Sequence, residues 1–393
     1  MGTFSAYYAR WQPCQPVIKE PMTMTSKSAA NTAEHPKPFI ALVALDDGSG
    51  NIACSFHDAG GAVYESHQPS LIEKGAAAGL GASHMSNSIW ETEEGERFTV
   101  RRNPTKPLTT LDPAYQLGQA NRVLAIDTMA KANLGGVACV VGCTLPVEQF
   151  YNRGDEAKPV NVERIQAKKD NLMKRATNVY GAYDSPVILH VKVFPEAFPA
   201  YYYCASKTPK DYPEEHKTLV VDLGEFTADL AIISTGDEFV DFSTHEHGIH
   251  LMVAHFRTLL ARHLDDVQSM LDADIKSIIK RGYIGSDKDN PAAIAARIDV
   301  THLIKESADY LNSLLQADIR ELARGQMHNL DRIVFVGGGA NWLREQAAGW
   351  HHTVDIPSDP HMAVVRGVQL LLQANAKELQ AEANAILAEK AAV

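Results

Sequence analysis

An apolar strand that runs into an acidic, glycine-containing turn is predicted at residues 39–51, which read FIALVALDDGSGN. A second unit of this kind occupies residues 218–234, TLVVDLGEFTADLAIIS, and a third strand ends in three glycines within residues 332–343, RIVFVGGGANWL. Each apolar run is short and stops at turn-forming residues, which is typical of a strand followed by a tight turn. The same local pattern therefore occurs three times in one chain.

Helices are predicted between these strands. Apolar residues recur at helical spacing in residues 113–135, 246–280 and 293–325, and a further helix is expected to begin near Met362. Residues 135–146, GGVACVVGCTLP, form a nearly continuous apolar run, as in a strand with both sheet faces covered. Because strands alternate with helices, the sequence predicts an α/β fold.

Composition and charge narrow the class of protein. The chain has 393 residues, with 48 acidic against 37 basic side chains and a formal net charge of −11. This balance disfavours DNA as a direct ligand, since neutralising phosphates supplies most of a DNA binder's affinity. The chain shows no apolar run of about 18 residues and no secretory signal, so we expect a soluble, cytoplasmic protein without a membrane partner. Residues 1–37 are expected to be a flexible extension.

The three turns contain what a bound nucleotide requires. Glycines allow backbone N–H groups to approach phosphate oxygens closely, and the hydroxyl groups of Ser49 and Thr227 are further donors. Asp47 and Asp222 would repel those phosphates unless a cation lay between, so their positions predict Mg²⁺. The sequence contains neither a P-loop motif nor a dinucleotide-binding glycine motif after a strand. Any one of the turns alone is better explained by a hairpin turn that binds nothing.

The order of the three turns resembles that of the actin-like ATPase superfamily, which includes actin, heat-shock chaperone ATPases and sugar kinases. Within it, residues 39–373 resemble the bacterial plasmid-segregation actins of the ParM/StbA family. The further matching segments are CTLPVEQFYN at residues 143–152, NVERIQAKKDN at 161–171 and KVFPEAFPAYY at 192–202.

The resemblance implies an α/β, actin-like (ribonuclease H-like) fold of two domains, with a nucleotide in the cleft between them. Domain I is expected at residues 38–217, with a small inserted subdomain, and domain II at residues 218–360. Residues 361–393 are expected to form a C-terminal helix and an Ala/Glu-rich tail.

The resemblance also implies roles for individual residues. It assigns Mg²⁺ to Asp47 and Asp222, and catalysis to Glu196. It assigns the nucleotide to two phosphate loops, an adenosine loop and a helix start, which comprise Gly48, Ser49, Gly50, Asn51, Gly224, Thr227, Gly337, Gly338, Gly339, Asn341 and Gly248. Glu225 and Phe226 depart from the family pattern, which has a second glycine and then a threonine at these places. The departure leaves the geometry of the second loop and the rate of hydrolysis open.

Glu196 has a chemical reason for its assigned role that does not depend on the family. Hydrolysis of a γ-phosphate requires an attacking water held in line, and a carboxylate can orient that water or accept its proton. Pro195 and Pro199 flank the glutamate and stiffen its loop.

The function implied by the resemblance is a filament-forming ATPase. The protein is expected to bind ATP (or GTP) with Mg²⁺, to assemble head to tail with copies of itself, and to hydrolyse the nucleotide. A centromere-binding adaptor protein would link the filament to plasmid DNA, which is then only an indirect partner. Two alternatives remain open at this point: an actin-like switch or scaffold that does not polymerise, and a small-molecule kinase of the ASKHA type.

Overall fold

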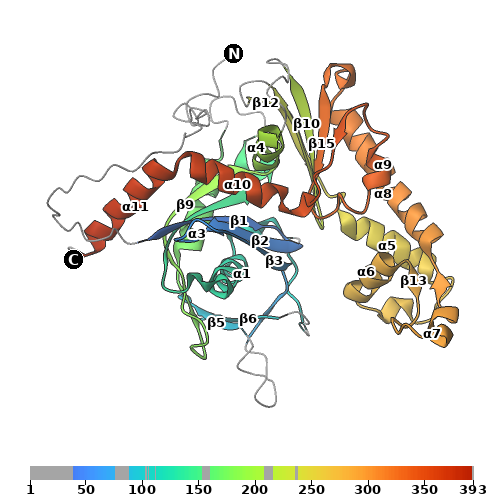
Figure 1. Ribbon diagram of the computed structural model, residues 1–393, viewed down its shortest axis with the longest axis horizontal. Coiled ribbons are helices and arrows are strands. Elements are labelled where there is room, and N and C mark those ends of the chain that lie inside the picture. Colours follow the sequence, from blue (N-terminus) through green and yellow to red (C-terminus); the bar gives the residue numbers. More distant parts are fainter. Residues whose placement is uncertain are drawn as a thin grey trace, which may run out of the picture.

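A computed structural model shows the chain as an α/β protein with two separate five-stranded sheets (Figure 1). The structure describes residues 39–75, 88–101, 104, 106–110, 112–152, 160–207, 216–234 and 238–391. The extension expected at residues 1–37 lies outside these described residues. The predicted α/β class is confirmed.

The first sheet has the strand order β3-β2-β1-β7-β9. Strand β1 pairs antiparallel with β2 and parallel with β7, and β7 pairs parallel with β9. The acidic turn at the end of β1 is therefore the hairpin that leads into β2. The strands of this sheet are β1 (Ile40–Asp47), β2 (Asn51–His57), β3 (Val63–Pro69), β7 (Ala138–Leu145) and β9 (Val187–Pro195).

The second sheet repeats this arrangement with the order β12-β11-β10-β15-β16. Strand β10 pairs antiparallel with β11 and parallel with β15, so β10 and β15 correspond in position to β1 and β7. The strands of this sheet are β10 (Lys217–Leu223), β11 (Ala228–Ser234), β12 (Glu238–His245), β15 (Arg332–Val336) and β16 (Val354–Asp355).

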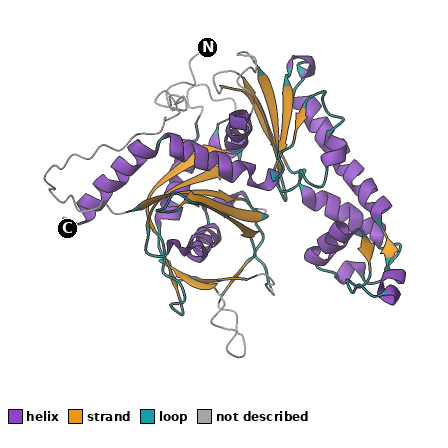
Figure 2. Cartoon of the chain, in the orientation of Figure 1, coloured by secondary structure: helices purple, strands orange, loops and turns teal. Residues whose placement is uncertain are grey.

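Two smaller sheets and several helices surround these two sheets (Figure 2). A four-stranded sheet consists of β4 (Ile72–Lys74), β5 (Ser88–Thr92), β6 (Arg97–Val100) and β8 (Ala176–Asn178). The pair β13 (Tyr283–Ile284) and β14 (Ile298–Asp299) lies far from it along the chain. The α-helices are α1 (Gln119–Met129), α2 (Val147–Phe150), α3 (Val162–Met173), α4 (Phe198–Lys207), α5 (Ile249–Leu260), α6 (Asp272–Arg281), α7 (Pro291–Ala295), α8 (Thr301–Leu322), α9 (Arg344–Ala347), α10 (Ala363–Ala374) and α11 (Ala376–Ala391). Short helical turns are η3 (Pro113–Leu117), η4 (Ala130–Leu134), η5 (Val267–Ser269), η6 (Met327–Asn329) and η7 (Pro360–Met362).

The two large sheets share one hydrophobic core. Alternate residues of each strand point to opposite faces, so one face of each sheet can pack toward the other half of the chain. Leu42 and Ala44 of β1 belong to the same core cluster as Val220 of β10 and Val334 of β15. The opposite faces pack into two further cores, one with α1 and the other with α5, α6 and α8.

Helices α4 and α10 fill the space within the shared core (Figure 1). Helix α10 crosses β1 and packs closely on α4, while α4 also contacts β10 and β15. The approach is closest at Gly367, where a β-carbon would collide with the backbone carbonyl of Pro199. Contact between these two helices therefore depends on a residue without a side chain.

The substitution Gly367→Ala tests this close approach. Because backbone atoms cannot move aside as a flexible side chain can, we expect the free energy of unfolding to fall by about 1–3 kcal/mol or more. Urea denaturation at equilibrium measures the change. Gly349→Ala is the matched control, since the nearest atom to its new β-carbon is 3.6 Å away. Equal stability of the two variants would contradict the packing described here.

Candidate functional site

The three turns predicted from the sequence meet at one place. A β-carbon built on Gly50, in the turn after β1, would lie 2.5 Å from the β-carbon of Glu225, in the turn after β10. A β-carbon on Gly338, in the turn after β15, would lie 3.9 Å from Nδ2 of Asn51. Residues from three distant parts of the chain thus come together at the ends of β1, β10 and β15.

Hydroxyl groups hold the first turn in place. The Ser70 side chain donates a hydrogen bond of 2.7 Å to the carbonyl of Gly48, and Thr110 donates one of 2.9 Å to the carbonyl of Ser49. The backbone N–H of Ser70 donates to the carbonyl of Gly50 at 3.0 Å. Three consecutive carbonyls are therefore fixed from outside the turn.

The third turn packs directly on the second and requires glycine at its first position. Gly337 has a φ of 87°, in the left-handed region that side chains disfavour. A β-carbon there would lie 2.5 Å from the carbonyl oxygen of Leu223 and would collide with the carboxylate of Asp222. The N–H of Gly339 donates to the same Leu223 carbonyl at 2.9 Å.

The start of helix α5 is fastened to the second turn as well. The N–H of Gly248 donates to the carbonyl of Phe226 at 3.1 Å, and the N–H of Ile249 donates to the carbonyl of Gly224 at 3.1 Å. The sequence-predicted residue Gly248 is therefore part of this assembly. Asn341 differs, because it is exposed and its Oδ1 accepts a hydrogen bond of 3.3 Å from Arg344.

Asp46 and Asp47 point to opposite faces of β1. Alternation along the strand places Asp46 on the face of Leu42 and Ala44, which is the face turned toward the second sheet. Asp47 follows Leu45 on the other face, and its side chain is buried. The geometry therefore favours Asp46, rather than the Asp47 named from the sequence, as the acid that faces Asp222.

Asp47 is engaged by a buried lysine. Its carboxylate pairs with Lys168 of α3, which also donates 2.6 Å and 3.1 Å hydrogen bonds to the side-chain oxygens of Gln116 and Asn121. Lys168 is fully buried, and these three contacts use all three protons of its ammonium group. The local sequence of α3, in which Lys168 is followed by a second lysine, gives no sign of this interaction.

Four carboxyl groups from both halves of the chain gather at the junction of the turns. Burial raises the pKa of Glu196 well above its ordinary value, and the charge of Asp229 adds to the effect. Burial and the charge of Asp46 raise the pKa of Asp222 in the same direction. Burial and the neighbouring Asp47 raise the pKa of Asp46 itself to about 7. These groups therefore resist carrying their negative charges at the same time.

Glu196 and Asp229 share a hydrogen bond across the two halves. Asp229 lies opposite Asp222 in the register of β10 and β11, and its carboxylate also accepts a 2.5 Å bond from the Thr244 hydroxyl. A weaker contact of 3.5 Å comes from the hydroxyl of Thr227. Asp229 was missed in the sequence analysis, although its position at the start of β11, two residues after Thr227 of the turn, could have indicated it.

The backbone next to Glu196 is strained. Ala197 has a φ of 70°, which costs an L-residue of this kind about 1–2 kcal/mol. The N–H of Glu196 donates to the carbonyl of Leu145 at 2.8 Å, and the carbonyl of Ala197 accepts the N–H of Tyr201 at 2.9 Å. A strained residue that its surroundings hold in place is a common feature of functional sites.

The departure of Glu225 from the family pattern has a local explanation. Its carboxylate forms a 2.5 Å ion pair with Lys276 of α6, so its charge is balanced within the same half of the chain. Its β-carbon lies close to the backbone of Gly50, an approach that a side chain at position 50 would prevent. Glu225 therefore joins the first turn to α6.

The group of carboxyls fits a hard divalent cation. Mg²⁺ takes oxygen ligands and is usually held by one or two carboxylates together with water or phosphate oxygens. Burial makes ionisation of Asp46 and Asp222 costly, the charge of Asp46 adds to the cost at Asp222, and a cation would relieve it. The chemistry of these donors thus matches the cofactor expected from the sequence.

The first half of the chain matches a known family. The family model StbA_N, described as "Plasmid segregation protein ParM, N-terminal", matches residues 41–207. No curated protein has a significant sequence match to the chain. Within the described residues, no helix has the length and apolar character needed to cross a bilayer.

Solved structures of actin-like proteins share the fold. Ta0583, an archaeal actin homolog, is 16% identical with a TM-score of 0.65, and the match covers 85% of this chain and 99% of that one. A 15-stranded ParM filament from Clostridium botulinum is 16% identical with a TM-score of 0.62, and the match covers 85% of this chain and 99% of that one. Bacillus thuringiensis ParM with ATP is 14% identical with a TM-score of 0.57, and the match covers 86% of this chain and 99% of that one. The actin-like fold expected from the sequence is confirmed by these likenesses.

The raised pKa of Asp46 leads to a testable pH dependence. The folded chain raises this pKa from 3.8 to about 7, so stability that is present at acidic pH is lost as the pH rises through 7. Without metal or nucleotide, we expect the free energy of unfolding of the Asp46→Asn variant to be higher than that of the wild type by about 1 kcal/mol or more at pH 8. The difference should be smaller near pH 5.5. Denaturant titration at several pH values measures both. Asp289→Asn, at a side chain that is 94% exposed, should show no such difference.

Proposed function

We propose that this protein is a nucleotide-driven filament protein of the ParM type. The premise is that residues 41–207 match the ParM N-terminal family and that the match to an actin-like structure covers 85% of the chain. In this proposal it binds ATP or GTP with Mg²⁺, polymerises, hydrolyses the nucleotide and moves plasmid DNA through a centromere-binding adaptor. The observation that carries the proposal is the meeting of three glycine turns beside carboxyl groups from both halves of the chain.

The nucleotide would contact the three turns, and the metal would be held by Asp46 and Asp222. Backbone N–H groups of the first two turns can face phosphate oxygens because Gly48, Gly50 and Gly224 have no side chains. Bound Mg²⁺ would neutralise charge on the phosphates and favour ionised carboxylates around it. In this assignment Asp46 replaces Asp47, whose carboxylate holds Lys168.

Glu196 is the residue proposed to act on water. Its strained neighbour Ala197 and the hydrogen bond to Leu145 fix the direction of the loop. Asp229 is hydrogen-bonded to Glu196, so it holds the orientation of the glutamate and can share its proton. Once ionised, Glu196 can orient a water molecule and accept a proton from it as the water attacks phosphorus.

Exposed apolar side chains support self-association. Leu271 is 69% exposed, and Ile294 and Ile298 are each 48% exposed. Leu271 directly precedes α6, and the two isoleucines lie in α7 and β14; α6, β13 and α7 lie at one end of the molecule, away from the first sheet (Figure 1). Exposed apolar surface of this kind often marks an interaction site. A head-to-tail contact that does not close into a ring produces an open filament.

Assembly and hydrolysis can be tested in one experiment. With ATP and Mg²⁺, we expect wild-type protein to scatter more light and to form filaments visible by electron microscopy, and then to release phosphate. Glu196→Ala should still assemble but should release phosphate about 100-fold to 10,000-fold more slowly, since one general base typically contributes this much. Glu345→Gln, at an exposed site on α9, is the control.

The outcomes separate the proposal from its rivals. No increase in scattering with ATP would favour a switch or scaffold that does not polymerise. ATP consumption that rises only with an added metabolite, with ADP formed and the phosphoryl group transferred to the metabolite, would favour a small-molecule kinase. Normal phosphate release by the Glu196 variant would show that another residue activates the water.

The metal assignment predicts different behaviour for neighbouring aspartates. Asp222→Ala and Asp46→Asn should lose Mg²⁺-dependent nucleotide binding in titration calorimetry, because each removes a proposed metal ligand. Asp47→Asn should instead lower the free energy of unfolding by about 3–5 kcal/mol, because Lys168 would keep a buried charge without its partner. Unchanged nucleotide affinity in the Asp222 variant would contradict its metal role.

A further inference from the structure

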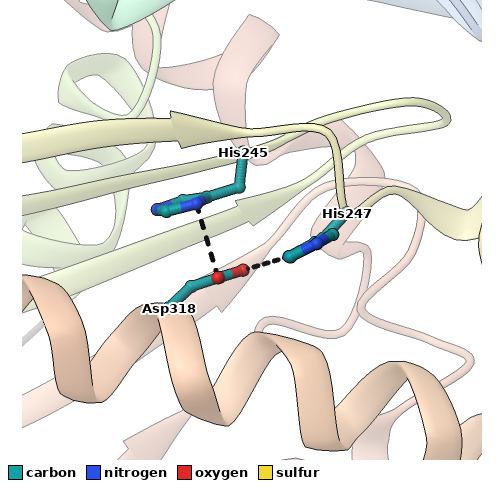
Figure 3. Close-up of side chains that lie close together, drawn as sticks. All are labelled: His245, His247 and Asp318. Atoms are coloured by element: carbon teal, nitrogen blue, oxygen red, sulfur yellow. Dashed lines mark hydrogen bonds and ion pairs between the residues drawn. The ribbon is translucent and has the colours of Figure 1, made fainter.

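Two histidines and an aspartate form a cluster on the outer side of the second sheet (Figure 3). His245 is the last residue of β12, His247 follows in the loop before α5, and Asp318 projects from α8. Residues two apart in an extended segment point to the same side, which brings both imidazoles over the carboxylate. The neighbouring Thr244 points the other way and bonds Asp229, so this cluster is separate from the carboxyls of the proposed nucleotide site.

The spacing of the donor atoms suits a metal ion. The three side chains offer one ligand atom each, and these atoms lie within 4.8 Å of one another. Nδ1 of His245 is 3.4 Å from one oxygen of Asp318, and Nδ1 of His247 is 2.6 Å from the other. Ligands of a tetrahedral Zn²⁺ are about 3.3 Å apart, given metal–ligand distances near 2.0–2.1 Å. One pair already has this separation, and the other needs to open by less than 1 Å.

The orientation of His245 is set by a third group. Its Nε2 lies 2.9 Å from the hydroxyl of Ser243, two residues earlier on the same face of β12. When Nε2–H donates to that hydroxyl, the neutral ring carries its lone pair on Nδ1, the atom that faces Asp318. Metal-binding histidines typically have their other ring nitrogen bonded in this way.

The charge balance also calls for a cation. The side chain of Asp318 is only 7% exposed, and the structure surrounds its carboxylate with the two imidazoles. A buried carboxylate is costly unless a positive partner accompanies it. In the tautomer whose Nε2–H donates to Ser243, the Nδ1 lone pair of His245 and an Asp318 oxygen are two acceptors that face each other at 3.4 Å, which is longer than an ordinary N–H···O bond. A metal ion between them would satisfy both.

We propose that His245, His247 and Asp318 form a binding site for a transition-metal dication of the Zn²⁺ class. Two imidazole nitrogens and one carboxylate oxygen suit Zn²⁺, whereas Mg²⁺ prefers oxygen ligands alone. Three protein ligands leave a fourth position for water. The bound ion ties helix α8 to the loop between β12 and α5.

The site lies beside the turn that is proposed to hold phosphate. His247 directly precedes Gly248, whose N–H bonds the carbonyl of Phe226 in that turn. Metal at the cluster therefore braces the backbone on which the second turn rests. The bracing of the second turn rests on the proposed function, whereas metal binding itself does not. The test is therefore made without nucleotide, so that the metal site and the proposed function can fail separately.

The test is a titration of untagged, metal-free, full-length protein with Co²⁺, followed by competition with Zn²⁺. We expect one equivalent of Co²⁺ to produce the visible absorption of a tetrahedral site, Zn²⁺ to displace it, and excess Mg²⁺ to leave it unchanged. Zn²⁺ should also raise the melting temperature. Absence of a stoichiometric tetrahedral spectrum from the folded wild-type protein would overturn the proposal without reference to any variant.

Variants identify the ligands. His247→Gln and Asp318→Asn should weaken Zn²⁺ binding by about 100-fold or more, since loss of a ligand should exceed the 10- to 100-fold effect of outer-shell changes. Ser243→Ala should weaken it by about 10- to 100-fold, because it frees the His245 ring without removing a ligand. Far-UV circular dichroism verifies that each variant is folded.

The matched control is the double variant His351→Ala/His352→Ala. It removes two neighbouring histidines that follow α9 in the chain and are not part of the cluster. It should keep the wild-type stoichiometry and affinity. If the folded His247 and Asp318 variants bind Zn²⁺ as the wild type does, the metal lies elsewhere and the assignment is wrong.

Discussion

The structure depends on a concentration of negative charge where the two halves of the chain meet. Asp46 and Glu196 come from the first half, and Asp222 and Asp229 come from the second. Burial raises the pKa of all four, and the charges of neighbouring acids in the group add to the effect at Glu196 and Asp222, so the ligand-free fold favours protons on some of them. A divalent cation with an anionic ligand would replace those protons. The same feature therefore weakens the empty protein at high pH and prepares it for a metal-bound phosphate.

Strand alternation explains why these carboxyls meet. In β1 the residues that pack into the shared core end at Asp46, and in β10 the corresponding residues end at Asp222. Register then places Asp229 opposite Asp222 on β11. Each sheet thus carries an aspartate, Asp46 or Asp222, near the end of its central strand, on the face turned toward the other sheet. A one-residue shift would move both acids into the outer cores.

The sequence was sufficient to predict the α/β class and the three turns, because apolar runs and glycine-rich turns are local signals. The actin-like fold was predicted from the resemblance of these and other segments to a known family. The sequence did not distinguish Asp46 from Asp47, since both stand at the end of the same strand and differ only in the hydrophobic core that each one faces. The partner of Asp47 could not be found locally either, because Lys168 is 121 residues away in the chain. The pairing of Glu225 with Lys276 could not be predicted for the same reason, because these two residues are also far apart in the chain. The two-domain division and the roles of the site residues remain predictions.

The relation between the two proposed cation sites follows from β12. Thr244 faces inward and bonds Asp229, whereas His245 faces outward toward Asp318 on α8. Adjacent residues of one strand therefore contact the carboxyls of the nucleotide site and the histidine cluster. A metal that fixes His245 and His247 limits the movement of the strand end and of Gly248, which bonds the second turn. Because the donor sets differ, oxygen-only on one face and nitrogen-rich on the other, the two sites can select different ions from the same solution.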